Sequence, residues 1–457
     1  MKTIIEPFRV KMVEPIRMTT KEERERIAAA QHFNLFAIRS DDVVIDLLTD
    51  SGTAAMSAAQ WGAMIQGDEA YACARSFYRF EEVIRELTGY RFILPTHQGR
   101  AAERILFSVV GKPGAVVPNN THFDTTQANV EHAGCVAVNL PCREAAEADS
   151  EAPFKGNMDL EGLRRVLGEY GKERVPLVMV TITNNSGGGQ PVSLENLRQV
   201  VEISHAHGVP VYLDAARFAE NAYFIKLREP GQEGRATREI AKEMFRLTDG
   251  CTMSAKKDAL VNIGGFLATN DEVVGQKMRD LLILTEGFTT YGGLAGRDLE
   301  AIARGLEEVL DEDYLRYRQA SIRYLGDRLH ALGIPMLRPV GGHAVYLDAR
   351  GFLPRVPPAQ FPGQALAVAI YVEGGVRTVE TGQVMFGRYD RPSGGEILAS
   401  RDLVRMAIPR RVYTQSHIDY VIEVMEEVWR RREGIGGLRI AWQPETLRHF
   451  TAKFAPV

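Results

Sequence analysis

The sequence is poor in cysteine and has no long apolar run. Its four cysteines, at positions 73, 135, 142 and 251 of 457 residues, show no CxxC or Cys/His ligand spacing. This pattern argues against a zinc site, and a chain of this size needs no disulfide framework. No run of about 18 apolar residues is present, and Glu and Pro interrupt the N-terminal stretch before it reaches signal length. We therefore expect a reducing, cytoplasmic location and no membrane span.

Positive charge is not in excess either. Lys and Arg total 55 against 59 Asp and Glu, a formal net charge of -4. Such a balance provides no electrostatic footprint for nucleic acid or for an acidic membrane surface. We expect a small-molecule partner, and neither nucleic acid nor membrane.

From about residue 90 to 270, short β-branched runs alternate with amphipathic stretches. This alternation predicts an α/β domain with a mostly parallel sheet and crossover helices on both faces. Residues 175–183 and the run PVYLDAA are apolar enough for central strands. The helix between them should begin after Ser193, a suitable N-cap, and end at Gly208. A GxGxxG motif is missing from any suitable position, which disfavours a nicotinamide-dependent oxidoreductase.

The length predicts two domains. From about residue 299 a long charged helical stretch is followed by shorter strands such as HAVYLDA and VRMAIP. We predict an N-terminal arm that forms part of a small domain at residues 1–56, a large domain at 57–310 and the rest of the small domain at 311–457.

The segment SAKKDALVNIGG follows the strand-like run GCTM. Its serine and adjacent lysines, Ser254, Lys256 and Lys257, at a strand end suit a Schiff base with pyridoxal phosphate. The freed amine of such a lysine is a base for the α-proton of an amino acid. Two solvated lysines that open a loop would give the same pattern, so the motif alone does not decide.

Several other polar residues follow predicted strands, where open α/β sheets bind ligands. Gln98, Gly99 and Arg100 lie at a helix start, where backbone N–H groups, the helix dipole and a guanidinium favour a phosphate. Ser254 adds a hydroxyl. An ordinary polar helix cap is the alternative for this group.

A second set of residues suits a planar ring. Asp214 follows the run VPVY, and a carboxylate there can pair with a protonated pyridine nitrogen. Arg217 and Asn185 could hydrogen-bond a ring hydroxylate, and Phe123 could stack on the ring. Each of the four also suits a turn or a packed core position.

Read together, these residues give a sequence that resembles the tryptophanase and tyrosine phenol-lyase family. The resemblance covers essentially the whole chain. Its motifs are EPFR, IDLLTDSGT, GDEAY, PTHQGR, GGQPVS, ENAYFIK, SAKKD, YGGLAGRD, GGHAV, IPRRVYT and LRHFTAK.

The resemblance implies a pyridoxal-phosphate enzyme of aspartate-aminotransferase-like fold (fold type I) that eliminates a group from the β-carbon of an amino acid. It assigns the Schiff base to Lys257, with Lys256 close by. It also assigns Gln98, Gly99, Arg100 and Ser254 to the phosphate and Phe123 to the ring face. Asp214 is assigned to the ring nitrogen, and Asn185 and Arg217 to the ring hydroxyl. Arg405 would bind the substrate carboxylate, for which a bidentate guanidinium is suited.

The family also implies a monovalent cation, usually potassium, at Glu69 and the backbone oxygens of Gly52 and Asn262. It further implies a homotetramer in which Tyr71 reaches the site of a neighbouring subunit.

The leaving group depends on residues that would touch the aromatic ring. Indole leaves after protonation at C3, and a carboxylate near N1–H favours the charge that then develops. Asp124 provides one, whereas tyrosine phenol-lyases usually carry Thr there. Thr381 stands where the phenol branch has an Arg, and His449 stands where that branch has Phe. Tryptophanases, however, usually have an apolar residue at the position of Thr381.

The resemblance therefore implies elimination of tryptophan to indole, pyruvate and ammonium, with tyrosine phenol-lyase as the alternative. Lys257, Tyr71, Asp124 and His449 are the expected catalytic residues. Arg405, Thr381 and Phe450 are expected to bind substrate.

Overall fold

A computed structural model describes residues 4–390, 395–445 and 447–457. The chain forms two compact units, each built from separate segments of the sequence. The large unit contains Ser51–Gln319 and Arg410–Val412, and the small unit contains Met1–Asp50, Ala320–Pro409 and Tyr413–Val457. The domain bounds expected from the sequence stay a prediction.

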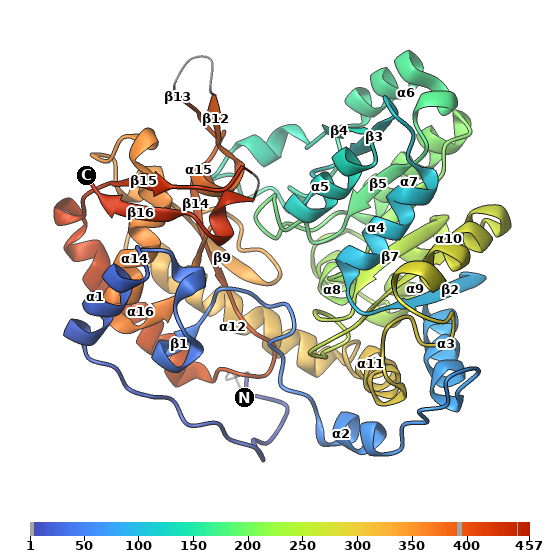
Figure 1. Cartoon of the computed structure of the whole chain (residues 1–457), viewed down its shortest axis with the longest axis horizontal. Helices are drawn as coiled ribbons and strands as arrows, with labels where there is room; N and C mark the ends of the chain where they lie inside the picture. The colour runs from blue at the N-terminus through green and yellow to red at the C-terminus, as the bar shows by residue number, and fades with distance from the viewer. Residues whose placement is uncertain (1–3, 391–394, 446) are drawn as a thin grey trace. The chain divides into compact units, whose positions relative to one another are not determined.

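A sheet of seven strands forms the centre of the large unit (Figure 1). Strands β3, β4, β5, β6 and β7 pair in parallel, and β8 pairs antiparallel with both β2 and β7. In the order of the sheet the strands are β2 (Phe92–Thr96), β8 (Gly265–Thr269), β7 (Gly250–Ser254), β6 (Val211–Asp214), β5 (Val178–Thr181), β3 (Val116–Asn119) and β4 (Val136–Asn139). The predicted α/β fold with a mostly parallel sheet is confirmed.

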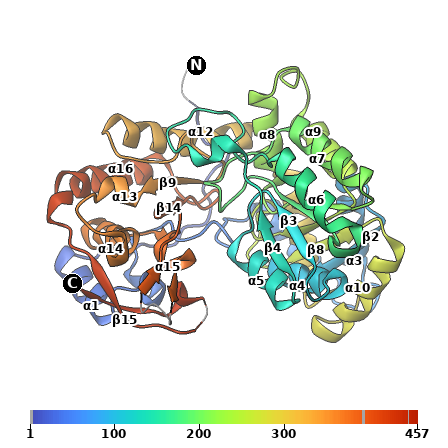
Figure 2. The same ribbon diagram turned by 90° about the horizontal axis from the view of Figure 1, so that it is seen from above.

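Helices cover both faces of this sheet. Successive residues of a strand point to opposite faces, so apolar side chains on both faces need to be buried. Val178 and Val180 of β5 pack with one apolar cluster, and Met179 between them packs with another. Helices α4, α5 and α10 lie on one side of the sheet, and α6, α7 and α9 lie on the other (Figure 2). The helices of the large unit are α2 (Ala58–Ile65), α3 (Arg75–Thr88), α4 (Gly99–Val110), α5 (Asp124–His132), α6 (Leu160–Arg174), α7 (Leu194–Ala206), α8 (Phe218–Arg228), α9 (Thr237–Leu247), α10 (Glu272–Thr285) and α11 (Gly296–Glu308).

Helix α7 begins where its sequence predicts. The Ser193 side chain accepts a hydrogen bond from the Asn196 N–H at 3.0 Å, and Gly208 follows the helix with φ +69°. The charged stretch after residue 299 is less continuous than expected. It is divided into α11 and α12 (Glu312–Ala331), and the Asp311 carboxylate accepts from the Tyr314 N–H at 2.9 Å at the start of the second helix. A side-chain cap of this kind satisfies an N–H group that the helix leaves open.

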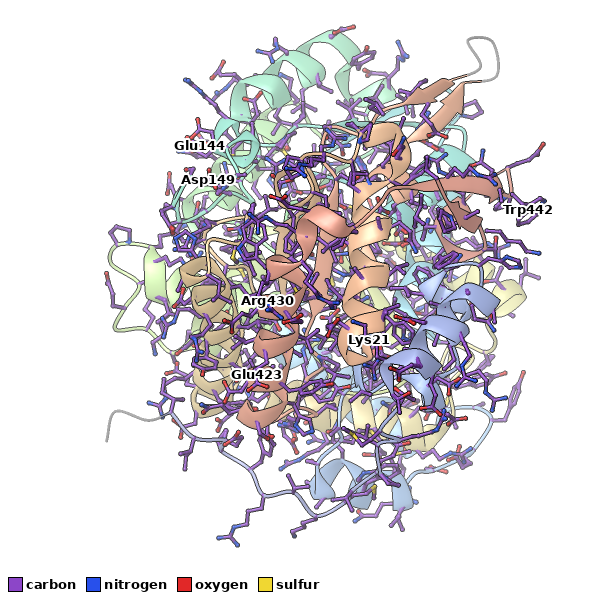
Figure 3. All side chains as sticks on the ribbon, turned by 90° about the vertical axis from the view of Figure 1, so that its left-hand side faces the viewer. Lys21, Glu144, Asp149, Glu423, Arg430 and Trp442 are labelled. Atoms are coloured by element: carbon purple, nitrogen blue, oxygen red, sulfur yellow. The ribbon has the colours of Figure 1, made fainter. Side chains whose placement is uncertain are left out.

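The small unit has a three-stranded antiparallel sheet in the order β11–β14–β9 and several short strand pairs. Helix α1 lies beside α14, where Lys21 forms an ion pair of 2.9 Å with Glu373. Figure 3 labels Lys21 on α1 and Arg430 at the end of α16. The elements of this unit are α1 (Lys21–Ala30), α13 (Ala349–Phe352), α14 (Pro362–Gly374), α15 (Gln383–Phe386), α16 (Gln415–Arg430), β1 (Ile45–Asp46), β9 (Ala344–Asp348), β10 (Val376–Arg377), β11 (Val379–Glu380), β12 (Arg388–Asp390), β13 (Gly395–Ile397), β14 (Leu403–Ala407), β15 (Leu438–Trp442), β16 (Lys453–Pro456) and the 3-10 turn η6 (Arg448–Phe450).

Among the residues that the structure describes, none of the helices combines the length and the apolar character that a membrane crossing requires.

Candidate active site

The N-terminus of α4 and the end of β7 lie against each other in the large unit. Gln98 is the N-cap residue of α4, and its side chain does not cap the helix. A Cβ atom at Gly99 would lie 2.6 Å from the Cβ of Ser254, so only glycine permits this approach. The open N–H groups of the helix, its dipole and the Ser254 side chain are therefore brought to one place, an arrangement that suits a phosphate.

Two cations, Lys256 and Arg100, lie next to the group formed by Gln98, Gly99 and Ser254, which we call the phosphate cup. Burial lowers the pKa of Lys256, and the charge of Arg100 lowers this pKa further. The two side chains are thus close enough to repel each other. A bound phosphate would compensate both charges, which makes the donor set of Gly99, Arg100, Ser254 and Lys256 chemically fitted to a phosphorylated ligand.

Asp214 and Lys257 come from neighbouring strands. Asp214 is the last residue of β6, and Lys257 lies in the turn after β7, with Asp214 paired to Thr252 in the parallel register. Burial raises the pKa of Asp214, while Lys257, the Ala216 N–H and Arg217 oppose that increase. The ammonium of Lys257 therefore acts on this carboxyl group. A buried carboxylate near an amine is suited to a ring nitrogen that carries a proton.

Asn185 and Arg217 follow two adjacent parallel strands, β5 and β6. Both side chains are buried. The Thr183 hydroxyl donates to the Arg217 carbonyl at 3.0 Å, which joins the two strand ends. Phe123 is the N-cap residue of α5 and is only partly buried, so its ring is not a core side chain. These positions are compatible with the predicted ring contacts, which stay a prediction.

Glu103 is a site residue that sequence reasoning missed. It lies on α4 among Ala102, Ile105 and Leu106, and its side chain is buried. Burial raises the pKa of Glu103 to about 7, the Asp214 charge raises it as well, and the Thr126 hydroxyl and Lys257 oppose this. A glutamate in the apolar face of an amphipathic helix was the signal in the sequence.

Asp124 begins α5 directly after Phe123. Its Oδ1 atom accepts a hydrogen bond of 2.6 Å from the Thr125 N–H. A helix N-terminus favours negative charge in its first turn. The backbone therefore holds this carboxylate at the start of α5, one residue after Phe123.

The predicted substrate residues lie in the small unit and are described within it. Arg405, in the middle of β14, donates from Nη2 to the Leu48 carbonyl at 2.9 Å. The Thr381 N–H donates to the Leu403 carbonyl at 2.8 Å, so Thr381 lies beside the start of the same strand. His449 and Phe450 lie in η6 with ring centroids 3.9 Å apart, and both rings contact Phe36.

Tyr71 is 71% exposed and lies with two other aromatic rings of the large unit. Its ring stacks on Phe288 at 5.7 Å and meets Tyr291 edge-on at 5.4 Å. The hydrogen bond with Tyr291 raises the pKa of Tyr71. The described contacts of Tyr71 thus hold it at the surface of its own unit.

Two of the three predicted cation positions lie together. The Asn262 side chain donates to the Gly52 carbonyl at 3.0 Å, and a Cβ at Gly52 would lie 3.0 Å from the Asn262 carbonyl oxygen. The third residue, Glu69, accepts from the Gly296 N–H at 2.7 Å and from the Arg297 N–H at 3.1 Å, and so caps α11. Over the described residues, no group of three or more His, Cys, Asp or Glu side chains could hold a metal ion.

The chain matches the family described as beta-eliminating lyase over residues 46–424, which is most of its length. The protein belongs to the beta-eliminating lyase family. As a member it is an enzyme, a carbon–carbon lyase.

Curated relatives of this lyase align with it from end to end. A tryptophanase from Hyphomonas neptunium is 60% identical and covers 99% of each chain. A tryptophanase from Salinibacter ruber is 58% identical over 100% of this chain and 96% of its own. A tyrosine phenol-lyase from Symbiobacterium is 51% identical over 99% of this chain and 98% of its own.

Solved structures agree on the fold of the lyase. A serine palmitoyltransferase from Sphingomonas wittichii superposes with a TM-score of 0.60, 16% identity and coverage of 91% of this chain and 97% of that chain. A structure of SPT with PLP superposes with a TM-score of 0.59 and 15% identity, and the match covers 91% of this chain and 97% of that chain. The predicted fold type I is confirmed.

Proposed function

We propose that this lyase cleaves L-tryptophan with water to indole, pyruvate and ammonium. The carboxylate of Asp124 carries the proposal, because the phenol branch usually has Thr at that position. The identities of 60% and 58% to tryptophanases, against 51% to a tyrosine phenol-lyase, also support it.

The residues at the carboxyl edge of the sheet fit pyridoxal phosphate. Gln98, Gly99, Arg100, Ser254 and Lys256 would hold its phosphate. The ring would lie against Phe123, with its nitrogen at Asp214 and its hydroxyl near Asn185 and Arg217. When bound through Lys257, the cofactor withdraws electrons from the substrate α-carbon.

The chain's own side chains would then handle the protons. Lys257 removes the proton at the α-carbon and Asp214 keeps the ring nitrogen protonated. Tyr71 donates a proton to indole C3, and Asp124 accepts a hydrogen bond from indole N1–H as positive charge develops there. Tyr71 is far more exposed than the other catalytic candidates, which is consistent with a role in the site of another subunit.

The small unit would bind the remainder of the substrate. Arg405 presents a planar guanidinium that suits a carboxylate. We propose that it binds the α-carboxylate and that Thr381, His449 and Phe450 surround the indole ring.

We also propose a monovalent cation and a homotetramer. The carbonyl oxygens of Gly52 and Asn262 and the Glu69 carboxylate are hard oxygen ligands of the kind that such an ion prefers. Replacing K⁺ by tetramethylammonium should lower the turnover rate. Sedimentation of the holoenzyme should give four times the mass of the chain.

Product analysis tests the proposed reaction. The holoenzyme with tryptophan should release indole and pyruvate in equal amounts. If pyruvate forms without indole, the leaving group is another one. Tyrosine phenol-lyase activity stays the second candidate, because Thr381 departs from the apolar residue usual in tryptophanases.

A further inference from the structure

Three charged residues from separate family motifs meet in the interior of the large unit. Glu220 comes from ENAYFIK, Asp258 from SAKKD and Arg410 from IPRRVYT, and each is at most 1% exposed. The Arg410 Nη2 atom lies 2.8 Å from Asp258 Oδ1 and 3.0 Å from Glu220 Oε1. The roles described so far use none of these three side chains. A buried arginine between two buried carboxylates is costly unless every partner is in place.

Asp258 directly follows Lys257 and fastens its turn to the end of β6. The Asp258 N–H donates to the Ala216 carbonyl at 3.3 Å, and Asp258 Oδ2 accepts from the Ala219 N–H at 2.7 Å. In the sequence, Ala216 lies between Asp214 and Arg217. Asp258 thus sets the distance between the lysine turn and the segment that carries the predicted ring partners.

The other side of the lysine turn is held by Gln60. Its Nε2 atom donates to the carbonyls of Ala259 at 3.3 Å and Leu260 at 3.2 Å. Leu260 has φ +57°, a left-handed conformation that a leucine rarely adopts, and its N–H donates to the Lys257 carbonyl at 3.0 Å. Gln60 therefore helps to hold a strained turn in which Lys257 is the first residue.

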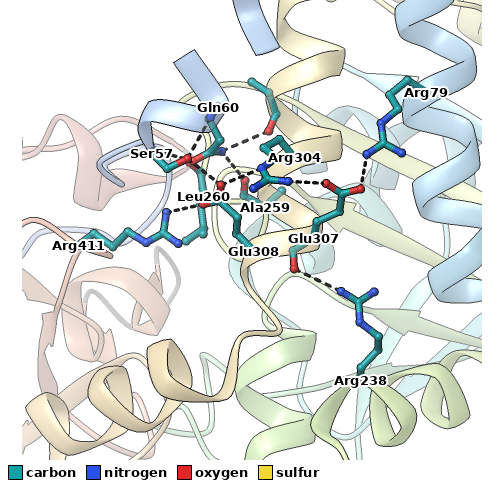
Figure 4. A network of polar contacts seen from close by, with 11 residues as sticks. Ser57, Gln60, Arg79, Arg238, Ala259, Leu260, Arg304, Glu307, Glu308 and Arg411 are labelled. Atoms are coloured by element: carbon teal, nitrogen blue, oxygen red, sulfur yellow. Dashed lines mark hydrogen bonds and ion pairs between the residues drawn. The ribbon is translucent and has the colours of Figure 1, made fainter. Parts of the chain in front are cut away.

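The residue next to Arg410 supports Gln60 (Figure 4). Arg411 pairs with Glu308 at 2.9 Å, and Glu308 accepts a hydrogen bond of 2.7 Å from the Ser57 hydroxyl. The Ser57 hydroxyl in turn accepts from the Gln60 N–H at 3.0 Å. Two consecutive arginines thus reach the two sides of the same turn, one through Asp258 and one through Glu308, Ser57 and Gln60.

We infer that Arg410 is a positioning residue for Lys257 and acts through Asp258. Without the guanidinium, Asp258 would lose its ion pair of 2.8 Å, whereas Glu220 would keep its pair with Arg318 at 3.1 Å. Asp258 would then give up its place beside Ala219 or take up a proton, and the turn would move. Burial already raises the pKa of Asp258 to about 7. The Arg410 charge is the largest opposing effect, the Glu220 charge raises the pKa as well, and the Ala219 N–H and the Arg217 charge lower it.

A displaced turn would slow proton transfer at the substrate α-carbon. A base must lie within hydrogen-bond reach of the proton that it removes, and a misplacement of about 1 Å can cost about 10²-fold in rate. This inference rests on the proposed role of Lys257. It does not depend on which aromatic group leaves the substrate.

The test compares the holoenzymes of Arg410→Met, Arg410→Lys and Asp258→Asn with the control Arg318→Met. Arg318 is 3% exposed and its Nε atom pairs with the same Glu220 at 3.1 Å. Three quantities are measured: exchange of the α-proton of L-alanine in D₂O, the pH midpoint of the visible cofactor band, and the urea midpoint of unfolding.

All the methionine variants should lower the urea midpoint. Only Arg410→Met and Asp258→Asn should slow alanine exchange, by about 10²-fold, and shift the pH midpoint of the visible band. Arg410→Lys should recover part of the exchange rate. Equal exchange rates in Arg410→Met and Arg318→Met would overturn the inference.

If Arg410→Met does not fold, Asp258→Asn decides, because it removes the charge and keeps the size of the side chain. A wild-type exchange rate in that variant contradicts the role of Asp258. Failure of the proposed tryptophan reaction is a separate outcome, since it would leave alanine exchange and the visible band intact.

Discussion

Glu103 accepts a hydrogen bond of 2.6 Å from the hydroxyl of Thr126. This bond joins helix α4, which begins at the phosphate cup, to helix α5, which begins at Asp124. Thr125 and Asn129 of α5 also donate to Glu103, each at 3.3 Å. One buried carboxyl group therefore links the two helix starts to which the phosphate and indole contacts are proposed.

Glu103→Gln should change how stability depends on pH. The folded-state pKa of about 7 lies above the ordinary value of 4.5, so the folded protein retains a proton that the unfolded chain has lost between these values. Stability of the wild type should therefore fall as the pH rises from about 4.5 to 7, by on the order of 3 kcal/mol from this group. The urea midpoint of unfolding is measured for the variant and the wild type across this pH range. The difference between the two midpoints should change with pH as the wild type loses this stability. A constant difference would contradict the raised pKa.

Gly99→Ala should weaken cofactor binding. The new Cβ would lie 2.6 Å from Ser254 Cβ, and relief of this contact moves the start of α4 away from the cup. Overpacking costs about 1–3 kcal/mol, so the affinity for pyridoxal phosphate should fall by roughly tenfold or more. Equilibrium titration of the apoprotein by absorbance measures it.

Gly168→Ala is the matched control for that experiment. Gly168 lies in α6 with no atom within 4 Å of an added Cβ. Alanine should raise stability there by roughly 0.5–1 kcal/mol and leave the cofactor affinity unchanged. A similar loss of affinity in both variants would contradict the role given to Gly99.

Lys257→Ala should abolish the visible absorbance band of the bound cofactor and lower turnover by at least about 10²-fold. Lys256→Ala should keep the band, because its ammonium is assigned to the phosphate. Absorbance spectra of the two purified variants distinguish the neighbouring lysines. A visible band in Lys257→Ala that is lost in Lys256→Ala would reverse the assignment.

The sequence predicts the large unit well because its pattern is local. The apolar run at residues 175–183 contains β5, and Ser193 caps α7, as expected from neighbouring residues alone. Asp214 ends β6 and Lys257 follows β7, which are adjacent strands, and the rule that ligands bind beyond strand ends places both residues at the same edge of the sheet.

Contacts between distant residues escape such reasoning. The sequence places Glu103 among the apolar residues of α4, but its partners Thr125, Thr126 and Asn129 lie on α5, and no local pattern relates them to it. Asp258 and Arg410 are 152 positions apart, and no period in the sequence relates them. The break between α11 and α12 depends on the Asp311 cap within a stretch of continuous helical character.

Asp124→Thr should remove most turnover of tryptophan. Loss of a hydrogen-bond partner for developing charge costs on the order of 10²–10³ in kcat. Exchange of the α-proton of L-alanine should stay near the wild-type rate, because Lys257 is untouched. An unchanged indole release rate would show that the carboxylate does not support the leaving group.

The ratio of kcat/KM for L-tryptophan to that for L-tyrosine, measured on the wild-type holoenzyme in potassium buffer, tests the central claim most directly. Because Asp124 is proposed to accept a hydrogen bond from indole N1–H, and Thr381 would offer no cation to a phenol hydroxyl, the ratio should be well above one. A ratio below one, with phenol and pyruvate formed together, would contradict the account and identify the phenol branch.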